Sequence, residues 1–243
     1  MGDPLTVDVY EGDEERVGVI DWDHYEAAGD PWNGAIIKAT QGRHYAPTWF
    51  QRTWPKLKGR RFRRGCYHYL MMNDDGSAQA DYFVDFVEKA GGFEAGDFDP
   101  VVDVETKGNE LATKDQVITC TRAFVDRVKE RTGRDVIIYG GTLMYDLGIT
   151  DRFGGSLLWI ARYTATLPAV VYERIGWDLG SVFGWQYCGD GEGYLEGYPV
   201  TSPIGAVDIT AMVNGINPDR GISSLLPVVG AVCGIVLLLW MFG

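Results

Sequence analysis

Two carboxylates stand two residues apart at the end of an apolar run, "DPVVDVE", residues 99–105. The three valines of this run are typical of a buried β-strand. Side chains at positions i and i+2 of a strand lie on the same face, so Asp103 and Glu105 are expected to point the same way, with Cα atoms roughly 6.7 Å apart. A carboxyl pair of this kind has the composition needed for glycoside hydrolysis, in which one group is protonated and the other charged.

Two further acids stand at predicted strand ends. Asp21 ends the run "VGVIDW" and Asp208 lies in "AVDIT". If the sheet closes into a barrel, its first and last strands are neighbours, so Asp21 and Asp208 should meet Asp103 and Glu105 at the mouth where α/β barrels carry out chemistry. Mutual repulsion would raise the pKa of at least one of them. A metal-binding carboxylate cluster is the alternative, and a lone strand-end Asp is ordinarily a cap or turn residue.

Aromatic side chains on the predicted strands fit the same interpretation. Flat rings stack on sugar faces, and phenol or indole groups bind hydroxyls, although single aromatic residues more often fill a barrel core. The candidates for substrate binding are Tyr67, Tyr139, Trp159, Tyr163 and Trp185. Of these, Tyr67, Tyr163 and Trp185 are the ones expected in a cleft.

The elements that must position these residues alternate along the chain. Amphipathic helices are predicted over 77–91, with Ala80, Phe83, Val84 and Val87 on one face, and over 113–133, with a weaker helix over 47–57. Thr113 is a plausible N-cap and Gly133 a plausible C-terminal stop. The eight predicted strands span 17–22, 34–40, 65–70, 100–105, 135–141, 157–163, 182–188 and 206–210.

Apolar strands that alternate with helices predict an α/β fold with a mostly parallel sheet covered by helices. Eight strands at regular spacing favour closure into a (β/α)8-like barrel over an open sheet. The connections over 141–157 and 163–182 are short or irregular, so some outer helices are expected to be missing. We assign this catalytic barrel to residues 17–213 and an acidic leader to residues 1–16.

Composition limits the partners. The net charge of −12 argues against nucleic-acid binding and against electrostatic docking on anionic lipid. The three histidines form no HExxH-like pair, and the four cysteines are too widely spaced for a zinc pair, so neither a metal nor a cofactor is expected. The cysteines are expected to be buried free thiols.

The C-terminal segment differs from the rest. Residues 225–242 are 18 apolar residues, about 27 Å as a helix, which predicts a membrane anchor after a linker over 214–224. A hydrophobic plug in an oligomer or virion, or a core helix, are the alternatives. The N-terminus has no basic start and no apolar run typical of a secretory signal. We therefore expect a membrane-associated protein held by its C-terminal helix in a host membrane or virion.

Eight segments in order resemble glycoside hydrolase family 25, the Chalaropsis-type lysozymes: "GVIDWD", "IKATQG", "GCYHYL", "VVDVE", "DVIIYG", "LLWIARY", "GWQYCG" and "AVDIT". The resemblance implies a flattened β/α barrel that cleaves the β-1,4 bond between N-acetylmuramic acid and N-acetylglucosamine. Carried over by position, Glu105 resembles the general acid/base, Asp103 the residue that holds the substrate acetamido group, and Asp21 and Asp208 the flanking acids. Lys38 and Gln186, in "IKATQG" and "GWQYCG", join the substrate-binding candidates. Gln41 stands where the family pattern "KATEG" has a carboxylate.

The expected function is therefore a retaining muramidase that acts on peptidoglycan, and we expect a viral enzyme for lysis or for entering the host cell, with virion or holin partners. Two other functions stay open. One is a catalytically silent barrel that binds glycan or builds a virion. The other is a chitinase-like hydrolase that acts on N-acetylglucosamine polymers.

Overall fold

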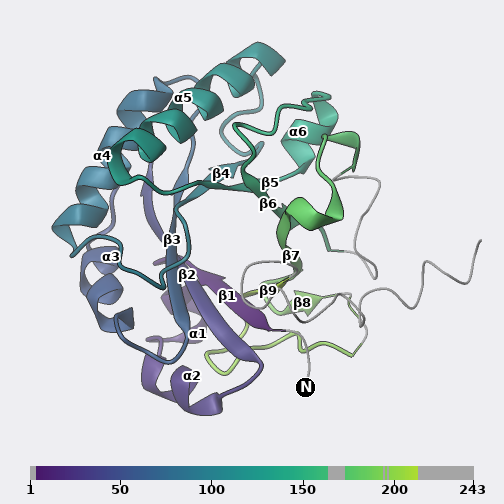
Figure 1. The fold of residues 1–243 in the computed structure, drawn as a ribbon. Coiled ribbons are helices and arrows are strands. Elements are labelled where there is room, and N and C mark those ends of the chain that lie inside the picture. Colours follow the sequence, from purple (N-terminus) through teal and green to yellow (C-terminus); the bar gives the residue numbers. More distant parts are fainter. Residues whose placement is uncertain (1–3, 164–172, 194, 196, 213–243) are drawn as a thin grey trace, which may run out of the picture.

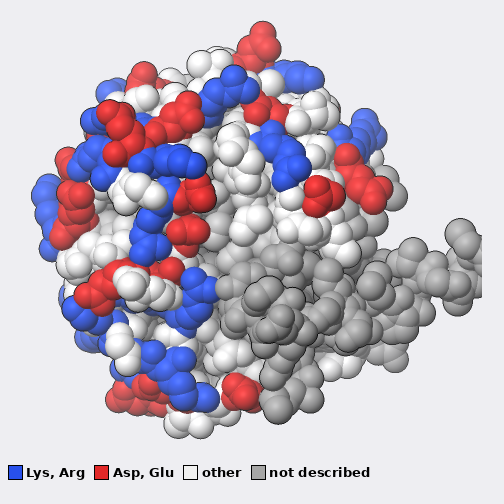
Figure 2. All heavy atoms as spheres, viewed as in Figure 1, with Lys and Arg blue, Asp and Glu red and all other residues white. Residues whose placement is uncertain are grey.

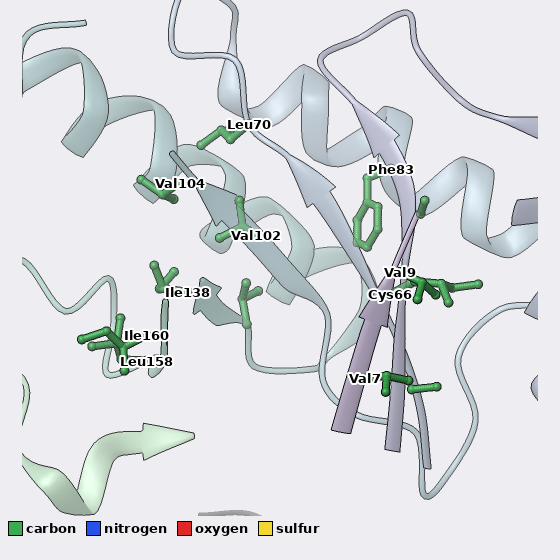
Figure 3. Packing of buried hydrophobic residues seen from close by; sticks show 14 of the residues in the cluster. Val7, Val9, Cys66, Leu70, Phe83, Val102, Val104, Ile138, Leu158 and Ile160 are labelled. Atoms are coloured by element: carbon green, nitrogen blue, oxygen red, sulfur yellow. The ribbon is translucent and has the colours of Figure 1, made fainter. Parts of the chain in front are cut away.

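Strand β4 (Val101–Val104) shows how the barrel divides its side chains between two cores. The computed structural model describes residues 4–163, 173–193, 195 and 197–212. In β4, Val102 and Val104 join the large apolar cluster under the outer helices, whereas Val101 joins a smaller cluster inside the barrel. Figure 3 shows part of the outer cluster, including Val102 and Val104. Because side chains alternate along a strand, Asp103 follows Val101 to the inside.

Eight strands close the barrel (Figure 1). Neighbouring strands from β1 to β7 run parallel, β6 pairs with β7, and β9 closes the ring by pairing antiparallel with both β7 and β1. A short strand, β8 (Glu192–Gly193), pairs antiparallel with the end of β7. The barrel strands are β1 (Leu5–Val9), β2 (Trp32–Gln41), β3 (Arg63–Tyr69), β4, β5 (Ile137–Gly140), β6 (Leu157–Ala161), β7 (Val182–Gly189) and β9 (Asp208–Met212).

The two longest described helices, α4 (Gly76–Lys89) and α5 (Lys114–Thr132), cover one side of the barrel (Figure 1). Helix α5 begins with a capping box between Thr113 and Gln116 and ends at Gly133 in the left-handed conformation, as the sequence predicts. The other helical elements are short: α1 (Asp13–Val17), α2 (Trp22–Ala28), α3 (Thr48–Thr53), η1 (Trp54–Leu57), α6 (Thr142–Asp146) and η2 (Leu179–Ser181).

The surface of these helices carries both signs of charge (Figure 2). Between α4 and α5, Arg127 and Arg131 both contact the Asp81 carboxylate at 2.8 Å. On the face that Figure 2 shows, Lys and Arg side chains are interspersed with Asp and Glu, so no single-sign stripe crosses these helices.

The barrel prediction is confirmed, and seven of the eight predicted strands are present. The prediction of a first strand over 17–22 is wrong. Residues 13–17 form α1, Gly18 has a φ of +82°, and Trp22 already lies in α2. The first strand is instead β1, inside the segment expected to be an acidic leader, so the barrel begins at residue 5 and not at residue 17. Its pairing with β2 and β9 is what makes the closure possible.

The expectation of free buried cysteines is confirmed for Cys66, Cys120 and Cys188. The fourth, Cys233, lies outside the described residues, as do the predicted linker 214–224 and the apolar segment 225–242. Among the helices that the structure describes, none is long and apolar enough to cross a bilayer.

Candidate active site

An open cavity of about 410 Å³ lies at the carboxyl ends of the parallel strands. Because β9 runs in the opposite direction, its first residue, Asp208, reaches the same mouth. The cavity is lined by Asp8, Tyr10, Lys38, Tyr67, Tyr69, Asp103, Glu105, Lys107, Tyr139, Trp159, Tyr163, Asp190 and Asp208.

Asp103 and Glu105 lie together in this cavity, as their spacing predicts. Asp103 is only 5 % exposed, and its Oδ1 atom has no hydrogen-bond partner among the described residues. Burial raises the pKa of Asp103 well above its usual value, and the neighbouring Glu105 charge raises it further. Burial also raises the pKa of Glu105, although the positive charges of Lys107 and Lys38 oppose the shift. The pair can therefore keep a proton at a pH at which exposed carboxyl groups have lost theirs.

A second carboxyl pair, Asp8 and Asp208, lies across the junction of β1 and β9. The two residues are direct partners in the antiparallel register. Burial raises the pKa of Asp8, and the charge of Asp208 raises it further. Burial raises the pKa of Asp208 to about 7, while a hydrogen bond of 2.9 Å from the backbone N–H of Asp190 to its Oδ1 atom acts against the shift. This pair also holds a proton near neutral pH.

The amide of Gln186 joins both sides of the mouth. Its Nε2 atom donates to Asp8 at 2.9 Å and to Asp208 at 3.2 Å. Its Oε1 atom accepts hydrogen bonds from the hydroxyls of Tyr139 at 2.8 Å and Tyr163 at 3.2 Å. Gln186 is fully buried and does not line the cavity, so it lies behind the cavity wall and not on its surface.

Lys38 brings a cation to the acidic mouth. Its Nζ atom lies 5.3 Å from the ring centre of Tyr69 and 5.4 Å from that of Tyr45, and it donates to Gln41 at 2.8 Å. Burial lowers the pKa of Lys38, and the nearby acids act against that shift. Gln41, which stands where the family pattern has a carboxylate, is therefore a neutral hydrogen-bond partner of this ammonium group.

Most of the predicted aromatic residues line the cavity. Tyr67, Tyr139, Trp159 and Tyr163 do so, and Tyr163 is 45 % exposed. The Trp159 indole donates to Thr210 at 2.9 Å, which holds the ring inside the barrel.

The expectation that Trp185 lies in the cleft is wrong. Trp185 is fully buried in the outer cluster, and its indole donates to the backbone oxygen of Arg162 at 2.6 Å. The pairing of β6 with β7 carries a register shift between Val182 and Gly184, so β7 has one extra residue there. Phe183 packs inside the barrel, so strict alternation would place Trp185 inside and Gln186 outside. The bulge shifts this pattern by one residue, so Gln186 faces inward and Trp185 faces outward.

The expectation that Asp21 meets Asp208 is wrong, because Asp21 has a structural role elsewhere. Asp21 is the N-cap of α2, and its Oδ1 atom accepts hydrogen bonds from the backbone N–H groups of Asp23 at 3.0 Å and His24 at 2.9 Å. Asp21 is not among the residues that line the cavity. The position opposite Asp208 belongs to Asp8.

Over the part of the chain that the structure describes, no group of three or more His, Cys, Asp or Glu side chains has an arrangement that could hold a metal ion.

Comparison with known proteins decides the family. The sequence profile of glycosyl hydrolases family 25 matches residues 7–195. The chain belongs to this family. The match begins in β1, one residue before Asp8, so the family 25 barrel includes the strand that lies in the expected leader. Asp208 lies beyond the matched region, and the pairing of β9 with β1 positions it opposite Asp8.

Individual proteins are similar to this chain over much of its length. Lysozyme M1 of Streptomyces globisporus is 30 % identical over 186 residues, which cover 72 % of this chain and 59 % of that protein. An uncharacterized protein of Escherichia coli, YegX, is 32 % identical over 178 residues, which cover 71 % of this chain and 60 % of YegX. This chain thus spans about three fifths of the length of these relatives. A solved bacterial lysozyme from Streptomyces coelicolor is 26 % identical with a TM-score of 0.70, over 93 % of this chain and 96 % of that one.

Sequence reasoning missed Asp8, Tyr10, Tyr69, Lys107 and Asp190 as lining residues of this family 25 site. A signal for Asp8 was present. In "LTVDV", Leu5, Val7 and Val9 alternate with Thr6 and Asp8, which is the period of a half-buried strand. The high acid content of residues 8–15 concealed this alternation.

Replacing Asp8 and Asp21 separately tests the correction. We expect Asp8→Asn to lower glycoside hydrolase activity about 10- to 100-fold, because it removes one ionisable group of the Asp8–Asp208 pair from the mouth. The same change should raise the melting temperature at pH 7 by about 2–4 °C, since an acid whose pKa is raised by folding destabilises the fold above its unfolded pKa. Turbidity assays and calorimetry measure both effects.

Asp21→Asn is the matched control, because Asn caps a helix as well as Asp does. It should leave activity within about twofold of the parent. A large loss for Asp21→Asn with none for Asp8→Asn would contradict the assignment of the flanking acid.

Proposed function

We propose that this family 25 chain is an N-acetylmuramidase that cleaves the β-1,4 bond between N-acetylmuramic acid and N-acetylglucosamine in peptidoglycan. The observation that carries the proposal is the Asp103–Glu105 pair, which lines an open cavity together with several tyrosines and whose pKa values burial raises. A protonated carboxyl beside a charged one is what glycoside hydrolysis requires.

The bound substrate would decide where the proton of this pair lies. Asp103 lines the cavity, and its Oδ1 atom is buried without a hydrogen-bond partner among the described residues. The carboxylate oxygen that faces the cavity would therefore accept a hydrogen bond from the N–H of a 2-acetamido group. A hydrogen bond to the ionised form stabilises that form, so the acetamido group would keep Asp103 charged. The shared proton then resides on Glu105, where it can act as general acid.

The reaction then has two steps. Glu105 gives its proton to the glycosidic oxygen as the bond to the anomeric carbon breaks, and the acetamido oxygen bonds to that carbon from the opposite face. A water molecule next attacks the anomeric carbon, Glu105 takes the proton of that water, and the bond to the acetamido oxygen breaks. Each step inverts the anomeric carbon, so we propose that the product retains the β configuration.

The proposal is tested with Glu105→Gln, which keeps the shape of the side chain but cannot donate or accept the proton. We expect activity on peptidoglycan to fall at least about 100-fold. For the parent protein, mass spectrometry of the released fragments should show N-acetylmuramic acid at the new reducing end, and NMR at early times should show the β anomer of that product. Glu130→Gln, an exposed residue on α5, is the control and should keep full activity. Unimpaired activity of Glu105→Gln would overturn the proposal.

A chitinase-like activity is the second candidate, because an N-acetylglucosamine polymer carries the same acetamido groups. The charges of the cavity favour peptidoglycan. Lys38 and Lys107 lie in the cavity wall, on β2 and just after β4, and present positive charge among the acids. N-acetylmuramic acid differs from N-acetylglucosamine by a lactyl group, which in peptidoglycan carries a peptide with carboxylates, and these cations would attract that negative charge. A silent binding barrel would not need a pair of acids whose pKa values burial raises.

Lys38→Met separates these candidates. We expect KM for soluble peptidoglycan fragments to rise about 3- to 10-fold, because a partly buried cation is lost. Activity on chitin oligosaccharides should change far less. Lys56→Met, on η1 away from the cavity, is the control. Equal effects of Lys38→Met on both substrates would contradict a role in recognising muramic acid, and efficient turnover of chitin by the parent protein would favour the second candidate.

We also propose that the apolar segment 225–242 holds the barrel at a membrane. Its 18 apolar residues, about 27 Å as a helix, support this proposal because the hydrocarbon layer is roughly 30 Å thick. A barrel held there must still reach the cell wall, and passage within a virion or through a holin would serve a viral enzyme for lysis or for entering the cell.

Flotation with liposomes tests the anchor. We expect the full chain to float with vesicles, and Val236→Arg to weaken this binding, since a charge in the middle of a spanning helix costs about 2.5–3.5 kcal/mol. Ile222→Arg, before the apolar run, should bind like the parent. A full chain that stays monomeric without detergent and does not float would exclude the anchor.

A further inference from the structure

The side chain of Gln186 uses its complete hydrogen-bonding capacity inside the barrel. A primary amide has two N–H donors and a carbonyl oxygen with two lone pairs. In Gln186 the donors reach Asp8 and Asp208, and the oxygen accepts from Tyr139 and Tyr163. The Asp8–Asp208 pair shares one proton, so one of its carboxylates is charged and fixes the orientation of the amide, because a reversed amide would place its oxygen against that charge.

The Tyr139 hydroxyl stands between two acceptors and has one proton to donate. One acceptor is the Oε1 atom of Gln186 at 2.8 Å. The other is the carboxyl group of Glu105, which lines the same cavity as Tyr139 and whose pKa the interaction with Tyr139 lowers. The phenol does not itself ionise, since burial raises the pKa of Tyr139 well above its usual value. Only the direction of its O–H bond can change.

We propose that Gln186 is a positioning residue for the Tyr139 hydroxyl. While Glu105 is protonated, the Tyr139 O–H donates to Gln186; when Glu105 is ionised, the Tyr139 O–H donates to Glu105 instead. This inference rests on the proposed role of Glu105. When Glu105 has given up its proton, the Tyr139 O–H turns from the Gln186 oxygen to the new carboxylate, and the bond from Tyr163 still satisfies that oxygen. When Glu105 takes a proton from water, the O–H turns back. No covalent bond forms or breaks in the tyrosine or the amide.

Other charged groups face the same two side chains. Glu105, directly after β4, faces Asp103 from β4, Lys38 from β2, Asp8 from β1 and Lys107 from the segment after β4. Gln186 faces Asp8 and Asp208, and Asp208 in turn faces Asp13, Arg16 and Asp190. A change at Gln186 therefore acts on Glu105 by two routes, through Tyr139 and through the charge of the Asp8–Asp208 pair. The experiment has to separate them.

The test is the pH dependence of kcat/KM for Gln186→Met, Tyr139→Phe and the double variant, on soluble peptidoglycan fragments. Gln186→Met frees the Tyr139 proton for Glu105, so the basic limb should move to lower pH by about 0.5–1 unit. Tyr139→Phe removes the donor to the Glu105 carboxylate, so the limb should move to higher pH. In the presence of Tyr139→Phe, Gln186→Met should produce a clearly smaller shift, because only the route through the aspartates remains.

Two further variants keep the test decisive. Gln186→Glu preserves the shape and offers a stronger acceptor with a negative charge, so it should move the basic limb to higher pH, opposite to Gln186→Met. Tyr187→Phe removes a neighbouring phenol on β7 whose hydroxyl donates to the backbone oxygen of Pro199, and it should leave the profile unchanged. A purely structural role of Gln186 would lower kcat without moving the limb in opposite directions.

Different results would overturn this inference and the proposed function. An equal shift from Gln186→Met with and without Tyr139→Phe would overturn the inference and leave the proposed function intact. Full activity of Glu105→Gln would instead remove the proposed function. If Gln186→Met does not fold, shifts of Tyr139→Phe and Gln186→Glu to higher pH support the inference, and an unmoved limb in either one overturns it.

Discussion

The structure depends on bringing carboxyl groups together in a place where water cannot fully solvate them. Asp8, Asp103, Glu105 and Asp208 come from three strands, and burial is the main cause of the raised pKa of each one. Taken alone this arrangement destabilises the fold, because charged forms lose hydration and repel one another. The same burial raises the pKa of each acid, and glycoside hydrolysis requires one carboxyl group that is still protonated when another is charged.

Closure of the barrel by β9 is what makes this gathering possible. A parallel last strand would bring its carboxyl end to the mouth, whereas the antiparallel β9 brings its first residue there, and that residue is Asp208. The antiparallel register then sets Asp208 directly against Asp8. The repulsion between them is offset by hydrogen bonds from the Gln186 amide to both and from the Asp190 backbone to Asp208.

The bulge in β7 links this electrostatic problem to the packing. The extra residue between Val182 and Gly184 turns Trp185 into the outer core and Gln186 into the barrel. An indole at the inner position would have one donor and no acceptor, whereas the amide has two of each. The bulge therefore places the large apolar side chain of Trp185 in the outer core and places at the site the amide of Gln186, which makes four hydrogen bonds.

The sequence by itself determined the class of fold, seven of the barrel strands, the two long helices and the meeting of Asp103 with Glu105. These features depend on local periodicity and on residues two apart in one strand. Only the tertiary structure decided that Asp8, and not Asp21, stands opposite Asp208, and that Gln186, and not Trp185, faces inward. The alternation around Asp8 indicates a strand but not which strand pairs with β9, and a bulge is visible only in the register of a neighbouring strand. Both depend on hydrogen bonds between segments far apart in the chain, which local patterns do not encode.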